Sequence, residues 1–287
     1  MITPAQFYRS NRWSIVSAVG CVVLVIIMAL AAPWLAPADP GQVNRHRMNE
    51  PPRWLNRPPA ATPADTLMGR DVRGRDVLSR VIYGARTSLL IGFVAVGIAA
   101  LVGVVLGAMA GYAGGVTDVI IMRVVDMLMA FPFLILALAV VSIIPRPTFW
   151  HIALVLGFTY WPGICRLTRG QVLSVRNHEY VKAAQALGAG NVRLLVRHIM
   201  PNCMAPVTIW FAMGIAAAVM GEASLSFLGL GEPDSLSWGS MIYMGLTRSD
   251  FPAEWWAALT PALALGVTVL GFNLLGDLLQ DYLNPRK

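Results

Sequence analysis

The sequence SLLIGFVAVGIAALVGVVLGAMA, residues 88–110, carries no charged side chain from its first residue to its last. A helix that crosses the hydrocarbon core of a bilayer needs about 20 consecutive apolar residues. A helix also satisfies its own backbone hydrogen bonds, which the lipid interior requires. This stretch therefore predicts a membrane-spanning helix.

Five further apolar runs lie outward from this one in both directions, at residues 13–32, 119–144, 149–165, 205–228 and 255–279. Together the six runs predict an all-α polytopic membrane protein with six transmembrane helices. Pro132 and Pro162 fall inside two of the runs and are expected to kink their helices, because proline removes a backbone donor.

The composition supports a chain in lipid. Of 287 residues, 56% are hydrophobic and 13% are charged, and the mean hydropathy is +0.62. Soluble domains carry about 25% charged residues. The net charge of +7 suits contact with anionic lipid. The arginines are spread between apolar runs and form no basic stripe, which argues against nucleic-acid binding.

Basic residues set the expected orientation. Arg9 and Arg12 precede the first run, Arg286 and Lys287 end the chain, and residues 166–204 are rich in arginine. The positive-inside rule places all three segments in the cytoplasm, with both termini. The first run also resembles a secretory signal, and we expect it to stay as an uncleaved anchor; cleavage would leave a five-span protein.

The connection at residues 33–87 is then extracytoplasmic, although it carries nine arginines; five acidic residues offset part of that charge. Its proline-rich first part predicts irregular structure. From Asp71 onward the pattern favours an interfacial amphipathic stretch leading into the second span. The later outer connection, residues 229–254, is expected to be a solvated loop, with a docking surface for another protein as the alternative.

The segment EYVKAAQALGAGNVRLLVRHIMP, residues 179–201, predicts two short amphipathic helices separated by a sharp bend. Gly188 and Gly190 should end the first helix, Asn191 should cap the second, and Pro201 should end it. Helical spacing groups the apolar residues into two faces: Tyr180, Ala183, Ala184 and Leu187 on the first helix, and Val192, Leu195, Val196 and Ile199 on the second. Such faces either pack on the protein's own spans or dock another protein, and the residues alone leave both alternatives open.

Four ionisable residues lie in or near the apolar runs: Arg123, Asp126, Glu222 and Asp277. Such groups are functional candidates by default. Arg123 and Asp126 are three residues apart on one helix face, which predicts a structural ion pair, with gating as the alternative. Glu222 is expected to bond to backbone or to a neighbouring subunit, or to line the outer part of a pathway.

Several kinds of site are not predicted. The two lysines are Lys182 and Lys287, and neither belongs to the Gly-Lys-Ser/Thr sequence of a phosphate-binding P-loop. If ATP drives this protein, a partner hydrolyses it. The histidines are scattered, the cysteines Cys21, Cys165 and Cys203 are far apart, and we predict neither a metal site nor a catalytic residue.

The pattern Ala183-Ala184, Gly188 and Pro201 resembles the EAA loop of ABC importer permeases, with Lys182 where the family usually has glutamate. Other matching segments extend the resemblance over nearly the whole chain: 74–80, 83–86, Asp126 with 130–132, 222–229, 276–277, Asp281 and 284–286. Residues 69–71 read Gly-Arg-Asp where relatives often have Gly-Thr-Asp. The chain is similar to the dipeptide, oligopeptide and nickel permease branch, in particular to its second, C-type subunit.

The resemblance implies a type I importer permease fold of five core helices plus an amino-terminal helix. It divides the chain into residues 1–32, the outer loop 33–87 and a permease core 88–287 with a coupling loop at 166–204. It implies that the coupling loop contacts an ATP-binding subunit through Glu179, Tyr180, Lys182, Ala183, Ala184, Leu187, Gly188, His198 and Pro201.

The implied partners are a second permease in a heterodimer, one or two ATP-binding subunits and an extracytoplasmic substrate-binding protein. The implied location is the bacterial cytoplasmic membrane. This chain would bind no cofactor, since ATP and Mg²⁺ belong to the partner ATPase. The implied cargo is di- or oligopeptides, with nickel or glutathione-like peptides as alternatives.

Three other classes of protein are alternatives. An ion-gradient-driven carrier predicts ionisable residues near the centres of the spans and often inverted repeats, and neither is apparent. A membrane enzyme needs a catalytic cluster, and a scaffold would explain the helical loop without a pathway. The importer interpretation explains both the loop and the missing P-loop.

Overall fold

The computed structural model describes residues 12–55, 66–232 and 235–283. These residues form an elongated bundle of helices, and the described part of the chain holds no strand beyond one bridge between Arg70 and Asp76. Arg9, Arg286 and Lys287, on which the predicted orientation partly rests, lie outside the described residues.

The central element is α4, Val77–Ala113, which packs along α7, Phe149–Val175. Asp76 caps α4 by accepting a hydrogen bond from the Ser79 amide at 2.7 Å. With 37 residues α4 extends about 55 Å, well beyond a hydrocarbon core of about 30 Å. The amphipathic stretch expected before the second span thus includes the first turns of this same helix.

Glycines let α4 and α7 approach closely. Gly103 and Gly107 are one turn apart on the face of α4 that meets α7. A Cβ added at Gly103 would lie 2.0 Å from Cγ2 of Ile164, and one at Gly107 would lie 2.4 Å from the Cys165 carbonyl oxygen. Small residues at this spacing allow close helix packing in membranes, where van der Waals contact drives association.

The third apolar run forms two helices, α5 at Gly115–Met129 and α6 at Phe133–Ser142, with a bend of 85° between them. The expected kink at Pro132 is therefore a complete break. Proline fixes its own φ and disfavours the helical conformation of the residue before it. Pro162, in contrast, lies inside the continuous helix α7.

The fourth run was predicted to end at Cys165, but α7 continues to Val175 because its last turns pack on α4 and α5. The loop elements follow: α8, Glu179–Ala186; α9, Asn191–Arg193; and η3, Leu194–Ile199, a π-helix. The next long helix is α10, Met200–Phe227.

The outer segments are more ordered than predicted. They contain α3, Ala32–Leu35, the short helices η1, Arg45–Arg47, and η2, Arg53–Leu55, and α11, Trp238–Thr247. The expectation of a solvated loop at 229–254 was wrong at α11, because Trp238 is fully buried there. Ion pairs neutralise part of the arginine charge of the segment before α4: Arg47–Glu50, Arg70–Glu50, Arg75–Asp71 and Arg80–Asp71.

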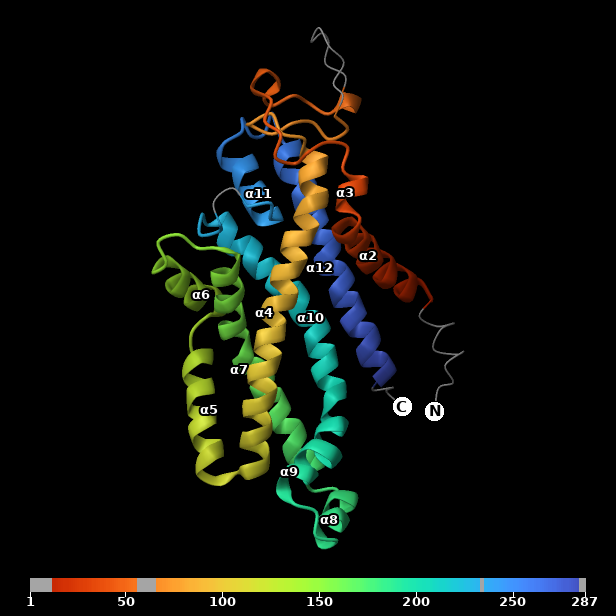
Figure 1. Cartoon of the computed structure of the whole chain (residues 1–287), viewed down its shortest axis with the longest axis vertical. Coiled ribbons are helices and arrows are strands. Elements are labelled where there is room, and N and C mark those ends of the chain that lie inside the picture. The colour runs from red at the N-terminus through yellow and green to blue at the C-terminus, as the bar shows by residue number, and fades with distance from the viewer. Residues whose placement is uncertain (1–11, 56–65, 233–234, 284–287) are drawn as a thin grey trace.

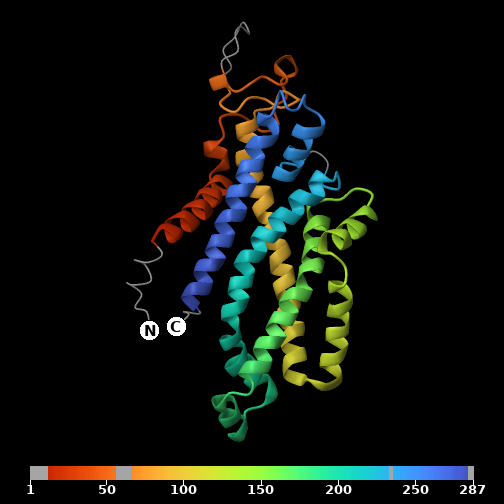
Figure 2. The same ribbon diagram turned by 180° about the vertical axis from the view of Figure 1, so that it is seen from behind.

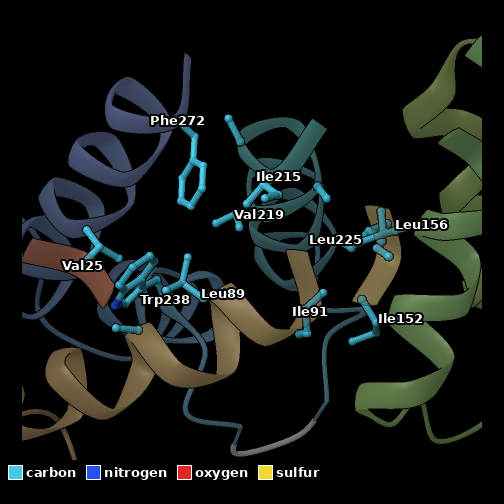
Figure 3. Packing of buried hydrophobic residues seen from close by; sticks show 14 of the residues in the cluster. Val25, Leu89, Ile91, Ile152, Leu156, Ile215, Val219, Leu225, Trp238 and Phe272 are labelled. Carbon is cyan, nitrogen blue, oxygen red and sulfur yellow. The ribbon is translucent and has the colours of Figure 1, made fainter. Parts of the chain in front are cut away.

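The main core lies between α4, α7, α10 and α12, Trp256–Leu283, with α2, Arg12–Leu30, packed on α12 and α4. Figure 3 shows Leu89 and Trp238 on one side of this core and Ile152 and Leu156 on the other. The indole of Trp238 donates to the Val81 carbonyl oxygen at 3.0 Å, so its polar atom is satisfied inside the core.

Three described helices are long and apolar enough to cross a membrane: α4, the continuous helix from Asn191 to Phe227, and α12. The α5–α6 pair adds a fourth if it is one bent span. The apolar part of α2 among the described residues, Ser14–Leu30, is shorter, and α7 carries Arg166 and Arg169 in its second half. The structure thus confirms an all-helical protein with several apolar spans, and the count of six stays a prediction.

Candidate functional site

The predicted coupling segment forms one end of the molecule, next to the neighbouring ends of α4, α7 and α10 (Figures 1 and 2). Three residues separate α7 from α8, and Glu179 lies in the first turn of α8, where the helix dipole favours an acidic group. The described ends of α2 and α12 that are nearest the chain termini point toward the same end of the bundle.

Gly188 ends α8, as predicted. It has φ of 85°, a left-handed conformation that suits glycine. Its amide donates to the Gln185 carbonyl oxygen at 3.0 Å, and the Ala189 amide donates to the Ala184 carbonyl oxygen at 3.1 Å. This pair of bonds is the Schellman motif, and it fixes the bend between α8 and α9.

One side of the loop packs on the protein itself. Val181 and Leu194 are buried there and Ala184 is half-buried. They join a cluster with Ala108, Val172, Val175, Ile199 and Cys203. Side chains of four helices and of η3 therefore meet in this cluster, which ties the loop to the ends of α4, α7 and α10.

The opposite side of the loop is exposed and partly apolar. Leu187 is 89% exposed, Val192 77% and Val196 62%. Tyr180, Lys182 and Ala183 are also exposed. Large apolar side chains clustered at an exposed end are typical of an interaction surface. We call Tyr180, Leu187, Val192 and Val196 the tip patch.

The predicted faces were partly wrong. Ala184 was grouped with Leu187 but turns toward the buried cluster, and Ile199 was grouped with Val192 but is fully buried. Leu194 and Ile199 are five residues apart and share the buried side. The i→i+5 bonding of a π-helix makes that spacing possible, whereas the prediction assumed α-helical spacing.

Pro201 does not end a helix, contrary to the prediction. It lies in the first turn of α10, directly after the π-helical η3, and the helix runs on through it. The His198 carbonyl oxygen accepts the Asn202 side-chain amide at 2.8 Å and lies 3.5 Å from the Tyr180 hydroxyl. Asn191 does not cap α9 either, because its side chain accepts the Tyr112 hydroxyl at 2.9 Å and Gly190 holds the cap position.

The structure does not join Arg123 to Asp126. Asp126 instead accepts Arg166 of α7 at 2.6 Å, and both of these side chains are about half exposed. Arg123 is exposed on α5, and Asp277 is exposed on α12. The intrahelical prediction was wrong because a better-placed cation from the neighbouring helix reaches the carboxylate.

A second pair, Asp118 with Arg169, was not predicted. Both guanidinium donors Nε and Nη2 meet the two carboxylate oxygens, the second at 2.7 Å. Arg176, at the end of α7, donates to the Gly111 carbonyl oxygen at the end of α4 at 2.8 Å. These partners are more than 50 residues apart in sequence, so periodicity carried no signal for them.

Glu222 is buried within this chain, and not at a subunit boundary or on backbone alone. It is 1% exposed near the outer end of α10 and accepts the Ser226 hydroxyl at 2.7 Å. Ser237 and Trp238, which precede and begin α11, are buried in the same region. Glu222 thus belongs to the packing of α10 against the outer segment.

Comparison with known proteins gives the family. A family model described as binding-protein-dependent transport system inner membrane component matches residues 103–287. This chain belongs to that family. A second model, the N-terminal transmembrane domain of oligopeptide transport permease C, matches residues 6–52. The family assigns the chain to the inner membrane components of binding-protein-dependent, ABC-type importers, a transport role.

The relatives of this permease cover nearly all of its length. The dipeptide transport system permease protein of Escherichia coli K12 is 41% identical over 290 residues, 99% of this chain and 94% of the relative. The di/tripeptide transport system permease protein of Pseudomonas aeruginosa is 38% identical over 266 residues, 92% and 86% of the two chains. The oligopeptide transport system permease protein of Bacillus subtilis is 37% identical over 280 residues, 97% and 87%.

A crystal structure of an amino acid ABC transporter with histidines shares the fold of this permease. Its TM-score is 0.54 at 17% sequence identity, and the match covers 71% of this chain and 94% of that one. This likeness shows a shared fold over most of that chain.

Proposed function

We propose that this chain is a membrane-spanning permease subunit of an ATP-driven importer of di- or oligopeptides. It forms the translocation pathway with a second permease and receives its peptide from an extracytoplasmic binding protein. The observation that carries the proposal is the near full-length similarity to permeases named for dipeptide and oligopeptide transport. The lack of a P-loop sequence in this chain supports the assignment of ATP hydrolysis to a separate subunit.

The proposed topology has six crossings: α2, α4, the α5–α6 pair, α7, α10 and α12. Successive members of this series point in opposite directions along the bundle, as crossings joined in sequence must (Figures 1 and 2). The loop at 179–201 and both chain termini are then cytoplasmic. This assignment agrees with the basic character of residues 166–204.

We assign the tip patch as the surface that meets the ATP-binding subunit. Its four apolar side chains are exposed, while the opposite side of the same loop is fixed to α4, α7 and α10 through the buried cluster. A force on the patch is therefore transmitted to three long helices. The other loop residues named from the resemblance divide accordingly: Lys182 and Ala183 flank the patch, while Ala184, Gly188, His198 and Pro201 support it.

Co-purification with the candidate ATP-binding subunit tests this surface. Leu187→Arg places a charge at the most exposed position of the patch and should reduce recovery of the ATP-binding subunit at least about tenfold, as for an interface hot spot. Val43→Arg is the matched control, since Val43 is 50% exposed in the outer segment and should leave recovery unchanged. Full recovery with Leu187→Arg would contradict the assignment.

A further inference from the structure

A recess opens where α5 breaks from α6 and faces α7 and α10. Its volume is about 320 Å³, at the lower end of the range for small-molecule sites. Its lining is apolar and aromatic, with no charged side chain: Leu128, Met129, Phe131, Phe133, Leu136, Thr159, Tyr160, Pro162, Gly163 and Trp210. The break at Pro132 creates the recess, because a straight helix would not turn Phe131 and Phe133 around it.

The aromatic wall is held in place before any ligand arrives. The rings of Phe133 and Tyr160 stack with centroids 4.8 Å apart. The Tyr160 hydroxyl donates to the Ala217 carbonyl oxygen at 2.9 Å, so its hydrogen is already bonded within the protein. Phe131 is 58% exposed at the rim. The recess thus presents ring surface and little polarity.

The face that carries the recess does not suit lipid. Asp126 and Arg166 pair at 2.6 Å with side chains 58% and 50% exposed. They lie about one helical turn from Met129 and Pro162, on the same side of α5 and α7. Each charged group exposed to hydrocarbon costs about 2.5–3.5 kcal/mol or more, so such groups face water or protein. In the proposed topology both groups lie on membrane crossings, the α5–α6 pair and α7, so the recess and the ion pair share a face directed at an aqueous path or a neighbouring subunit.

We propose that this recess receives an apolar or aromatic side chain of the peptide in transit. The inference rests on the proposed function and adds a subsite to it. The hydrated ion pair lies beside the polar backbone of the peptide, and the uncharged recess accepts its side chain by desolvation. Because the lining carries no charged side chain and few polar atoms, it favours bulk over a particular chemical group.

Filling the recess tests the proposal. A Cβ at Gly163 would have the Trp210 Nε1 atom as its nearest neighbour, at 3.9 Å, so Gly163→Leu adds volume without a clash at its first carbon. Gly266→Leu on α12 is the matched control, since no atom lies within 4 Å of its added Cβ. The measured quantity is the ratio of two initial uptake rates in the assembled importer, that of diphenylalanine divided by that of dialanine.

We expect Gly163→Leu to lower this ratio about tenfold, the low end of discrimination in apolar pockets, and Gly266→Leu to leave it unchanged. A dipeptide bearing benzoylphenylalanine should also photo-cross-link to α5, α6 or α7 of the wild-type complex, with competition by diphenylalanine. This second readout decides the matter if Gly163→Leu fails to assemble.

Two results would overturn the inference in distinguishable ways. Dialanine uptake with an unchanged ratio, or a cross-link outside the recess, assigns the recess to a lipid chain or to a side chain of the second permease and leaves the proposed function standing. Absence of ATP-dependent uptake of either peptide by the wild type removes the proposed function and the subsite with it.

Discussion

At the scale of single residues, the contact between α4 and α7 depends on side chains that are missing. Gly103 leaves room for Ile164, and the Trp161 carbonyl oxygen would lie 2.7 Å from an added Cβ. Backbone cannot move aside as the end of a flexible side chain can. The glycine is therefore required for packing, and not for its backbone conformation.

Gly103→Ala should destabilise the chain by about 1–3 kcal/mol, the usual cost of overpacking. Gly97→Ala on the same helix is the control, because no atom lies within 4 Å of its added Cβ. It should be neutral or stabilising by up to about 1 kcal/mol, since alanine is the better helix former. Thermal unfolding of the detergent-solubilised protein measures both, and equal midpoints would contradict the packing account.

The two ion pairs between α5 and α7 should differ in strength. Asp118 and Arg169 are 19% and 30% exposed and meet through two hydrogen bonds, whereas Asp126 and Arg166 are 58% and 50% exposed. A bidentate, partly buried pair is stronger than an exposed one. A double-mutant cycle with alanine should give about 1–2 kcal/mol for the first pair and under about 1 kcal/mol for the second. The reverse order would show that exposure does not set these energies.

At the scale of elements, the sharp turn after α8 gives the tip patch its shape. The Schellman bonds of Gly188 and Ala189 reverse the chain, so that Leu187 and Val192 both project from the end of the molecule. Gly188 has open space around it, so its conformation is the single reason for a glycine there.

Gly188→Ala should destabilise the turn after α8 by about 1–2 kcal/mol, because the left-handed conformation crowds a Cβ. Gly190→Ala is the matched control, since Gly190 has φ of −67° and open space. Gly188→Asn should recover part of the loss, because asparagine tolerates this conformation. ATP hydrolysis stimulated by peptide and binding protein measures the effect, and equal activities of the two alanine variants would contradict it.

The sequence predicted elements whose signal is local. The apolar runs, the helix at 179–186 and its glycine stop follow from composition and short spacing. The buried side of η3, with Leu194 and Ile199, did not follow from short spacing, because the π-helical register depends on packing against α7 and α10. Asp118–Arg169 and the break that forms the recess depend on contacts between helices, which one sequence does not reveal.

At the scale of the whole molecule, the orientation can be read with single cysteines in a chain whose native cysteines are replaced by alanine. Val43→Cys should react with a membrane-impermeant maleimide in intact cells, and Leu187→Cys should react after the membrane is opened. Both positions are exposed. Val43 follows α3 and Leu187 follows α8, and these two helices lie toward opposite ends of the bundle (Figure 1). Labelling of Leu187→Cys in intact cells would contradict the proposed topology.

In the proposed importer, the ATP-binding subunit acts on the tip patch, whereas the peptide crosses the membrane elsewhere in the same chain. The buried cluster under the patch and the long helices α4, α7 and α10 supply a continuous connection between the two. Such coupling requires an element with two arrangements, and both the tip patch and the transport site must shift the equilibrium between them.

The most direct test is ATP-dependent uptake of labelled dialanine by proteoliposomes that contain this chain, its partner permease, the ATP-binding subunits and the binding protein. The account predicts accumulation that requires ATP, and Leu187→Arg should abolish it while Val43→Arg, the exposed outer control, retains uptake. Accumulation driven by an ion gradient without any ATP-binding subunit would contradict the account.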